Sequence, residues 1–124
     1  MIVRALLATI AMIAAAQSLG AQTVDSAAQV ARGKTLFDGR GLCFSCHGKG
    51  GEGVLGPTTK LVGRVLTHTK ALAPEIAALI RSGVDSSHST SGQLMPPRGG
   101  SRISDDDVAA VAAYVMVLRQ NHPD

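Results

Sequence analysis

The spacing of apolar positions predicts three longer helices, and the first is expected over residues 26–38. Val30, Gly33 and Phe37 fall on one face of this segment, and Gly39 ends it. Glycine inside a helix costs about 1 kcal/mol relative to alanine. Gly33 therefore predicts that another backbone approaches the helix closely at this position.

A second helix is expected to begin at Pro74 and to end at Gly83. Proline is favoured in the first helical turn, and glycine is favoured just after the last one. Ile76, Leu79 and Ile80 form the apolar stripe of this segment.

The third helix has the clearest pattern. Ser104 and Asp107 have the spacing of a capping box, and Ile103 is placed to pack against Val108. Acidic residues at 105–107 are best explained by the positive end of the helix dipole rather than by a metal site. The expected buried side consists of Val108, Val111, Val115 and Leu118, with Tyr114 beside it.

The segments between these helices read as loops. Residues 51–56 formally match the dinucleotide fingerprint, but they run into Pro57 instead of a helix, so we reject that match. Residues 61–69 have no clear period and are expected to be a loop or one short helix. Residues 84–101 form a long polar loop of a kind that is usually functional or disordered. Because no strand is convincing, we predict an all-α fold.

The N-terminus has the pattern of an export signal. A short basic start at residues 1–4 precedes an apolar run at 5–16, and small residues lie near Gly20, where cleavage is expected. The alternative is an uncleaved anchor, but the run is shorter than the roughly 20 residues of a spanning helix. No cysteine lies in the signal region, so no lipid anchor is predicted. The expected organisation is 1–20 signal peptide, 21–25 linker, 26–120 domain and 121–124 C-terminal tail, with the mature protein in the periplasm.

Composition changes this picture in two ways. The formal net charge is only +3 and the basic residues are dispersed, which argues against a nucleic-acid partner. The aromatic residues are limited to Phe37, Phe44 and Tyr114, and tryptophan is absent. A small domain with so thin a core usually needs a disulfide, a metal or a cofactor to stabilise it.

The most specific motif is Cys43-Phe44-Ser45-Cys46-His47, whose spacing is that of c-type haem attachment. Cys43 and Cys46 would form thioethers with the two vinyl groups, and His47 would coordinate the iron. A disulfide between the two cysteines is the alternative in an oxidising compartment. It would close only a very short loop and would leave His47 without a role.

Met95 is the expected second axial ligand of the iron. It lies in the polar loop and is followed by two prolines, which stiffen the chain. Met116, in contrast, is explained as a gap-filling core residue. Met/His ligation leaves no open coordination position and suits electron transfer. The competing ligands are His68, His122 and, as the most serious rival, His88.

These residues together resemble the class I c-type cytochromes, the small monohaem electron carriers of bacteria. The resemblance covers nearly all of the mature chain. It implies a cytochrome c fold with 3–5 helices packed around one covalently bound haem c. It also implies that Gly33 and Phe37 contact Tyr114 of the last helix. Pro57 would accept the imidazole N–H of His47 through its carbonyl.

The chain departs from many relatives in having no tryptophan or extra tyrosine near the haem propionates. Partners for the propionates are therefore open, with Arg64, Gln93 and Arg98 as candidates. Lys49, Lys60 and Arg98 are candidates for a docking rim around the haem edge, and ordinary solvated charges are the equal alternative.

The expected function is single-electron transfer from a donor dehydrogenase or reductase to an acceptor oxidase or another cytochrome. No substrate is expected to undergo bond chemistry, so the protein is not predicted to be an enzyme. It would act as a monomer or as a subunit of a larger complex, with the cytochrome subunit of a dehydrogenase complex as the alternative function. The alternatives are a haem-based gas sensor and an enzyme, such as a peroxidase, with an open iron site.

Overall fold

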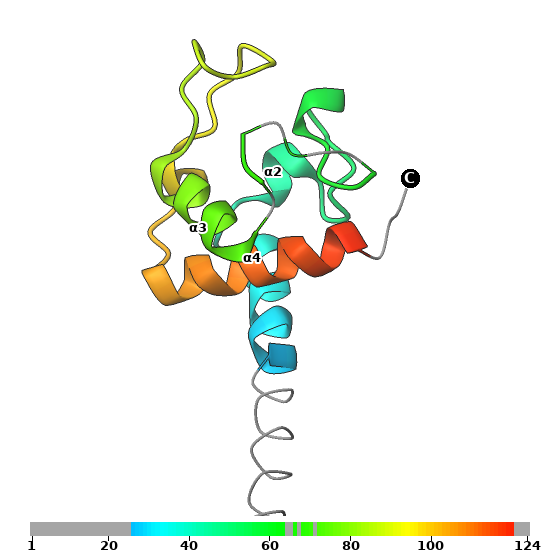
Figure 1. The fold of residues 1–124 in the computed structure, drawn as a ribbon, viewed down its shortest axis with the longest axis vertical. Helices are drawn as coiled ribbons and strands as arrows, with labels where there is room; N and C mark the ends of the chain where they lie inside the picture. Colours follow the sequence, from blue (N-terminus) through cyan, green and yellow to red (C-terminus); the bar gives the residue numbers. More distant parts are fainter. Residues whose placement is uncertain (1–25, 64–65, 67, 71, 121–124) are drawn as a thin grey trace, which may run out of the picture.

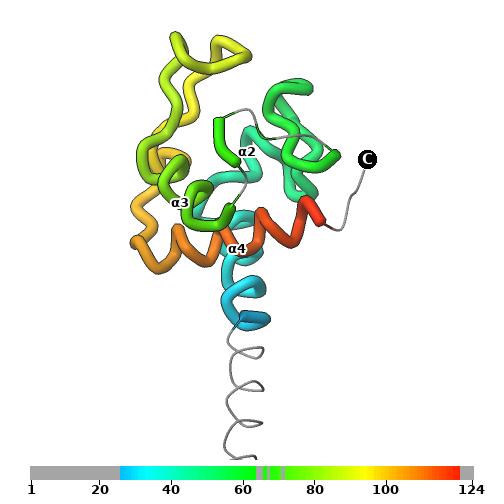
Figure 2. The backbone as a smooth tube through the Cα atoms, viewed as in Figure 1, coloured from blue at the N-terminus to red at the C-terminus, as the bar shows by residue number. Residues whose placement is uncertain are grey.

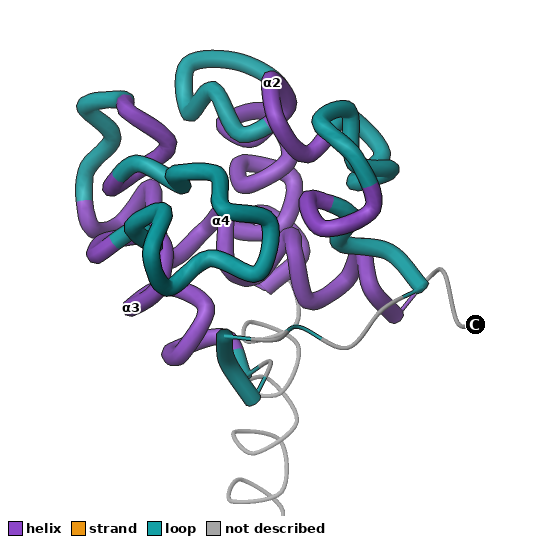
Figure 3. The backbone as a smooth tube through the Cα atoms, turned by 90° about the horizontal axis from the view of Figure 1, so that it is seen from above, coloured by secondary structure: helices purple, strands orange, loops and turns teal. Residues whose placement is uncertain are grey.

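The computed structural model describes residues 26–63, 66, 68–70 and 72–120 of the chain (Figure 1). The described part contains no strand and is helical, as Figure 3 shows, which confirms the all-α prediction. In order, the elements are a helix over residues 26–37, α2 (Phe44–His47), the 3-10 turn η1 (Pro57–Thr59), α3 (Ala73–Ser82), the 3-10 turn η2 (Pro97–Gly100) and α4 (Asp105–Gln120).

The helix over residues 26–37 crosses α4 at close range, below the rest of the domain in Figure 1. A Cβ atom added to Gly33 would lie 1.9 Å from the carbonyl oxygen of Ala110, so only glycine permits this approach. Phe37 and Tyr114 meet edge to face with ring centroids 5.4 Å apart. The predicted close approach and the predicted aromatic pair are therefore confirmed.

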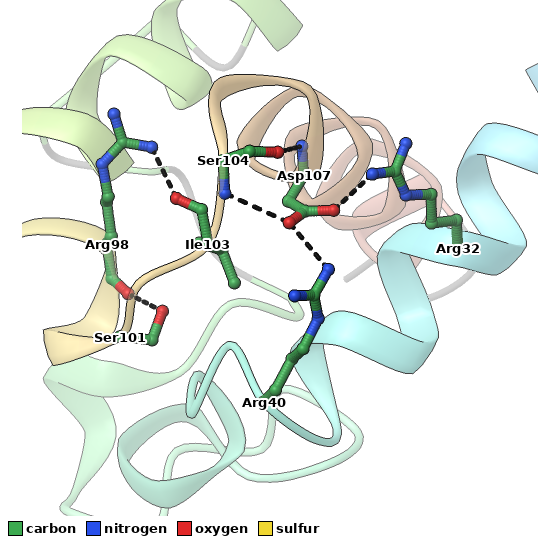
Figure 4. Close-up of polar contacts among 7 residues, drawn as sticks. All are labelled: Arg32, Arg40, Arg98, Ser101, Ile103, Ser104 and Asp107. Atoms are coloured by element: carbon green, nitrogen blue, oxygen red, sulfur yellow. Dashed lines mark hydrogen bonds and ion pairs between the residues drawn. The ribbon is translucent and has the colours of Figure 1, made fainter.

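The capping box at the start of α4 is also confirmed. The Asp107 amide donates to Ser104 Oγ at 3.1 Å, and the Ser104 amide donates to Asp107 Oδ2 at 3.1 Å. Residue spacing alone did not indicate a second role for this carboxylate. Asp107 is only 2% exposed and also pairs with Arg32 and, at 2.8 Å, with Arg40 (Figure 4). It thereby ties α4 to the first helix and to the turn after it.

Helix α3 has the predicted bounds to within one residue. Pro74 lies in its first turn, and Gly83 caps its end with a φ of 68°. Ile76 and Ile80 are buried in the core. Leu79, the third residue of the expected stripe, is half-buried.

The long loop over residues 84–101 has more structure than the sequence indicated. Val84 and Met95 form an antiparallel bridge, and η2 follows directly after it. Residues 85–94 leave this bridge and return to it, forming an excursion that projects from the domain (Figure 2). In the described part of 61–69 there is no helix; the short helical turn lies earlier, in η1.

The expected signal peptide, linker and C-terminal tail lie outside the described residues. Among the residues that are described, no helix is long and apolar enough to cross a membrane.

Candidate functional site

A large cavity lies between α2, α3, α4 and the chain around Met95. The space between its walls, with the open solvent at its mouth included, is about 1260 Å³. Its walls contain Cys43, Cys46, His47 and Met95.

The inner wall of this cavity is apolar. Phe37, Val111 and Val115 line it and are buried in the core. Leu55 and Leu94 also line it, yet about half of each side chain is exposed, at 49% and 59% respectively. The cavity therefore has apolar side chains both at its base and at its mouth, which suits a hydrophobic ligand with one edge near solvent.

The two cysteines are placed by the short helix α2. Cys43 is its N-cap, and the His47 amide donates to the Cys43 carbonyl at 3.0 Å. This single turn brings both thiols and the imidazole to the same cavity. Both cysteines are free thiols. Burial raises the pKa of the Cys43 thiol to about 11, so it stays protonated at neutral pH.

The imidazole of His47 is oriented by a backbone carbonyl. Its Nδ1 atom lies 2.6 Å from the carbonyl oxygen of Thr59. The resemblance had implied the Pro57 carbonyl for this position. Here the Pro57 carbonyl instead accepts the Lys60 amide at 3.3 Å, because Pro57 begins the 3-10 turn that carries Thr59. The acceptor in the structure is thus two residues later than expected.

This hydrogen bond selects one tautomer of His47. A carbonyl can only accept, so Nδ1 must carry the proton, and in the neutral ring Nε2 then has the free lone pair. Burial lowers the pKa of His47, although the Thr59 hydrogen bond opposes that shift. The neutral form, which is the form that binds metals, is therefore favoured.

The histidines considered as rivals of Met95 are in different surroundings. His68 lines the cavity and is exposed. The His88 side chain is 79% exposed, and its Nδ1 lies 2.7 Å from Asp85 Oδ2, within the projecting excursion. His122 lies outside the described residues. Of the histidines that the structure describes, His68 is thus a more direct rival than His88, contrary to the sequence-based ranking.

The candidate partners of the haem propionates also differ in where they lie and in what they contact. Gln93 lines the cavity, and Arg64 lies outside the described residues. Arg98 is engaged elsewhere: its guanidinium donates to the Ile103 carbonyl at 2.8 Å and to Asp105 at 2.6 Å (Figure 4 shows the first contact).

The candidate docking rim is divided in the same way. Lys60 lines the cavity. Lys49 lies over the Phe44 ring, with its Nζ atom 5.9 Å from the ring centroid. Arg98, the third candidate, is committed to the start of α4 through Asp105.

The donor set of the cavity fits a c-type haem. Two free thiols and one neutral imidazole come from α2, and a thioether comes from Met95 in the chain after α3. Met95 and Met116 are both half-buried against the core, and of these two only Met95 lines the cavity. Sequence reasoning missed Thr59, because a backbone carbonyl has no residue-specific signal. It missed the pairing of Asp107, because contacts between distant segments follow no local spacing.

Comparison with protein families identifies the family of the chain. Residues 28–115 match the family described as cytochrome C oxidase, cbb3-type, subunit III. The comparisons with curated proteins and with solved structures found no match. The family match spans most of the chain and includes every cavity residue singled out above. The chain therefore belongs to this family of c-type cytochromes, and its domain has a haem-based electron-transfer role.

Proposed function

We propose that the protein is an exported carrier of single electrons with one haem c, held through Cys43 and Cys46 and ligated axially by His47 and Met95. One observation carries the proposal. Met95 and the cysteine–histidine motif come from separate parts of the sequence, and all four side chains line one apolar cavity.

Each residue would have a distinct task. Each thiol of Cys43 and Cys46 would add across one vinyl group: the S–H bond breaks, a C–S bond forms, and the hydrogen goes to the other vinyl carbon. His47 would present Nε2 to the iron, held in that tautomer by Thr59. Pro57 would act indirectly, by starting the turn that carries Thr59. The haem supplies an iron that accepts and releases one electron.

Ligation by both His47 and Met95 would favour electron transfer over chemistry at the metal. Methionine opposite histidine raises the reduction potential and leaves no open position for a substrate. Leu55 and Leu94 at the cavity mouth would give a redox partner an apolar contact near the haem edge. The partners would be a donor dehydrogenase or reductase and an acceptor oxidase or cytochrome in the periplasm.

The test is the visible spectrum of the oxidised and reduced protein, before and after Met95→Ala. Loss of the red methionine-to-iron charge-transfer band and a lower reduction potential are expected. His68→Ala and His88→Ala serve as matched controls, and both should keep the band. The wild-type ferrous protein should resist carbon monoxide, whereas Met95→Ala should bind it.

An unchanged spectrum in Met95→Ala would refute the ligand assignment. Loss of the native spectrum in His68→Ala instead would transfer the role to the histidine that lines the cavity. Ready binding of carbon monoxide by the wild-type protein would favour the gas sensor or the peroxidase over the electron carrier.

A second candidate, a cytochrome subunit of an oxidase complex, is favoured by the family match to an oxidase subunit. It would carry the same haem but deliver electrons within an assembly. Native gel electrophoresis of solubilised membranes, stained for haem, separates the two. A haem band that migrates with an oxidase supports the subunit, and a small soluble haem protein in the periplasmic fraction supports the free carrier.

A further inference from the structure

We propose that Gly83 and Val84, at the end of α3, form a backbone clamp that positions Met95 as the distal ligand. The inference rests on the proposed function, because it assumes that Met95 binds the iron. Gly83 does not line the cavity, and Val84, which does, would contribute here through its main chain. Both would act through the main chain of Met95, so they are positioning residues.

Gly83 lies against the main chain on both sides of Pro96. A Cβ atom added there would lie 2.4 Å from the Met95 carbonyl oxygen and 2.7 Å from the Pro97 nitrogen. Both neighbours are backbone atoms, which cannot move aside as a flexible side chain can. The φ of Gly83 is also +68°, in the region that favours glycine. Any larger residue would therefore push the Met95 segment away from α3.

Val84 holds the same segment by hydrogen bonds. Its amide donates to the Met95 carbonyl at 2.8 Å, and its carbonyl accepts the Met95 amide at 2.8 Å. The two bonds engage both polar backbone groups of Met95. They therefore restrict where its Cα atom lies and from where its side chain starts.

The clamp is anchored in the core through α3. The Gly83 amide donates to the Leu79 carbonyl at 2.8 Å, closing the last turn of the helix. Ile80 in that turn is buried. The position of Met95 is thus determined by contacts with the end of a packed helix rather than by contacts with a loop.

The excursion at residues 85–94 does not carry this restraint. Asp85 accepts hydrogen bonds from Ser87 and from the His88 amide, so these contacts lie inside the excursion. Figure 2 shows the excursion extending away from the domain beyond the bridge. Its polar contacts organise the loop, while the bridge at its base fixes Met95.

Loosening the clamp should raise the fraction of molecules in which Met95 has left the iron. A ligand that binds only the open form reports that fraction directly. One backbone hydrogen bond and its close contact correspond to a change of about tenfold in such an equilibrium.

The test compares Gly83→Ala with Gly92→Ala. Gly92 has the same φ of +68° and lies in the excursion, but a Cβ atom there would meet nothing within 4 Å. Gly83 also has a ψ of −173°, and this pair of angles is almost confined to glycine. Only Gly83→Ala brings a Cβ atom against the Met95 segment, and Val84→Pro separates that collision from the backbone strain at position 83. We expect Gly83→Ala to weaken the methionine-to-iron band, lower the reduction potential and speed carbon monoxide binding by about tenfold. Gly92→Ala should match the wild type in all three.

Val84→Pro is the second variant: it removes the amide donor to Met95 and fixes φ at position 84. Val84→Ala, which keeps the amide but shortens the side chain of this cavity-lining residue, is its control. Val84→Pro should shift the same three measurements in the same direction, and it decides the question if Gly83→Ala does not fold. Circular dichroism and covalently retained haem identify the folded variants. Equal spectra for Gly83→Ala and Gly92→Ala, or a wild-type spectrum in Val84→Pro, would overturn the clamp. If the clamp variants fail to shift the spectrum but Met95→Ala abolishes the methionine-to-iron band in the same series, only the clamp is refuted. The proposed function is then left intact.

Discussion

Two regions of this domain are held in place by different kinds of contact: the crossing of the helix over residues 26–37 with α4, and the segment around Met95. Between the helix over residues 26–37 and α4, the contacts are close and largely buried: Gly33 lies against the Ala110 carbonyl, Phe37 is 1% exposed, and the buried Asp107 carboxylate pairs with Arg32 and Arg40. Around Met95 the contacts are main-chain hydrogen bonds at the base of an exposed polar excursion.

Because of this difference, we expect the helix crossing to determine the stability of the fold and the segment around Met95 to determine how firmly the proposed ligand is held. Side-chain packing contributes most of the free energy of folding and tolerates little change. A segment held by two backbone hydrogen bonds opens at a lower free-energy cost than the core. Substitutions at the helix crossing should therefore change stability, whereas those near Met95 should change the spectrum and the potential.

The largest expected effect comes from removing the proposed covalent attachment of the haem through Cys43 and Cys46. Cys43→Ser with Cys46→Ser should retain no haem on a denaturing gel stained for haem. Because the core is small and poor in aromatic residues, little folded protein should remain by circular dichroism. Ser45→Ala, between the two cysteines, is the control and should retain its haem. A stable fold of the double variant without haem would show that the domain does not need the cofactor in order to fold.

The next effect tests the helix crossing. Gly33→Ala should lower the free energy of unfolding by about 2 kcal/mol, because the new methyl group meets the Ala110 carbonyl. Helix propensity alone predicts the opposite, a gain of about 1 kcal/mol. Ala31→Gly, at an exposed position of the same helix, is the reciprocal control and should cost about 1 kcal/mol. Denaturant unfolding of the haem-bound protein measures both, and a more stable Gly33→Ala would contradict the close packing.

The smallest effect is expected at Asp107 and depends on pH. The hydrogen bond from the Ser104 amide, together with Arg32 and Arg40, holds the pKa of Asp107 below its usual value. A carboxylate with a lowered folded-state pKa stabilises the fold above its unfolded-state pKa of about 3.9. That contribution is lost as the pH falls through the folded-state value.

Asp107→Asn should therefore lower the Tm at pH 7 by more than about 4 °C. The difference from the wild type should shrink below about pH 4. Asp106→Asn is the matched control, since it removes a charge from the same helical turn at an exposed position. Thermal unfolding followed by circular dichroism between pH 3 and pH 7 measures the effect, with the range set by the usual carboxyl pKa. Equal shifts for Asp106→Asn and Asp107→Asn would reduce the role of Asp107 to that of a helix-dipole charge.

Local pattern alone predicted much of this domain. The three longer helices, the capping box of Ser104 and Asp107, the stop at Gly83 and the contact across Gly33 follow from residue spacing and backbone preference. Such features depend on residues that are a few positions apart in the chain, so they can be predicted directly from the sequence. The cysteine–histidine motif is of the same kind, because one helical turn brings its three side chains together.

Tertiary structure decided the features that join distant segments. It placed Met95 in the same cavity as the motif, made the Thr59 carbonyl the partner of His47, and left His88 outside while His68 lines the cavity. It also paired Asp107 with Arg32 and Arg40 and joined Met95 to Val84. Backbone carbonyls have no residue-specific signal, and long-range contacts have no fixed spacing. Their positions therefore emerge only when the helices pack.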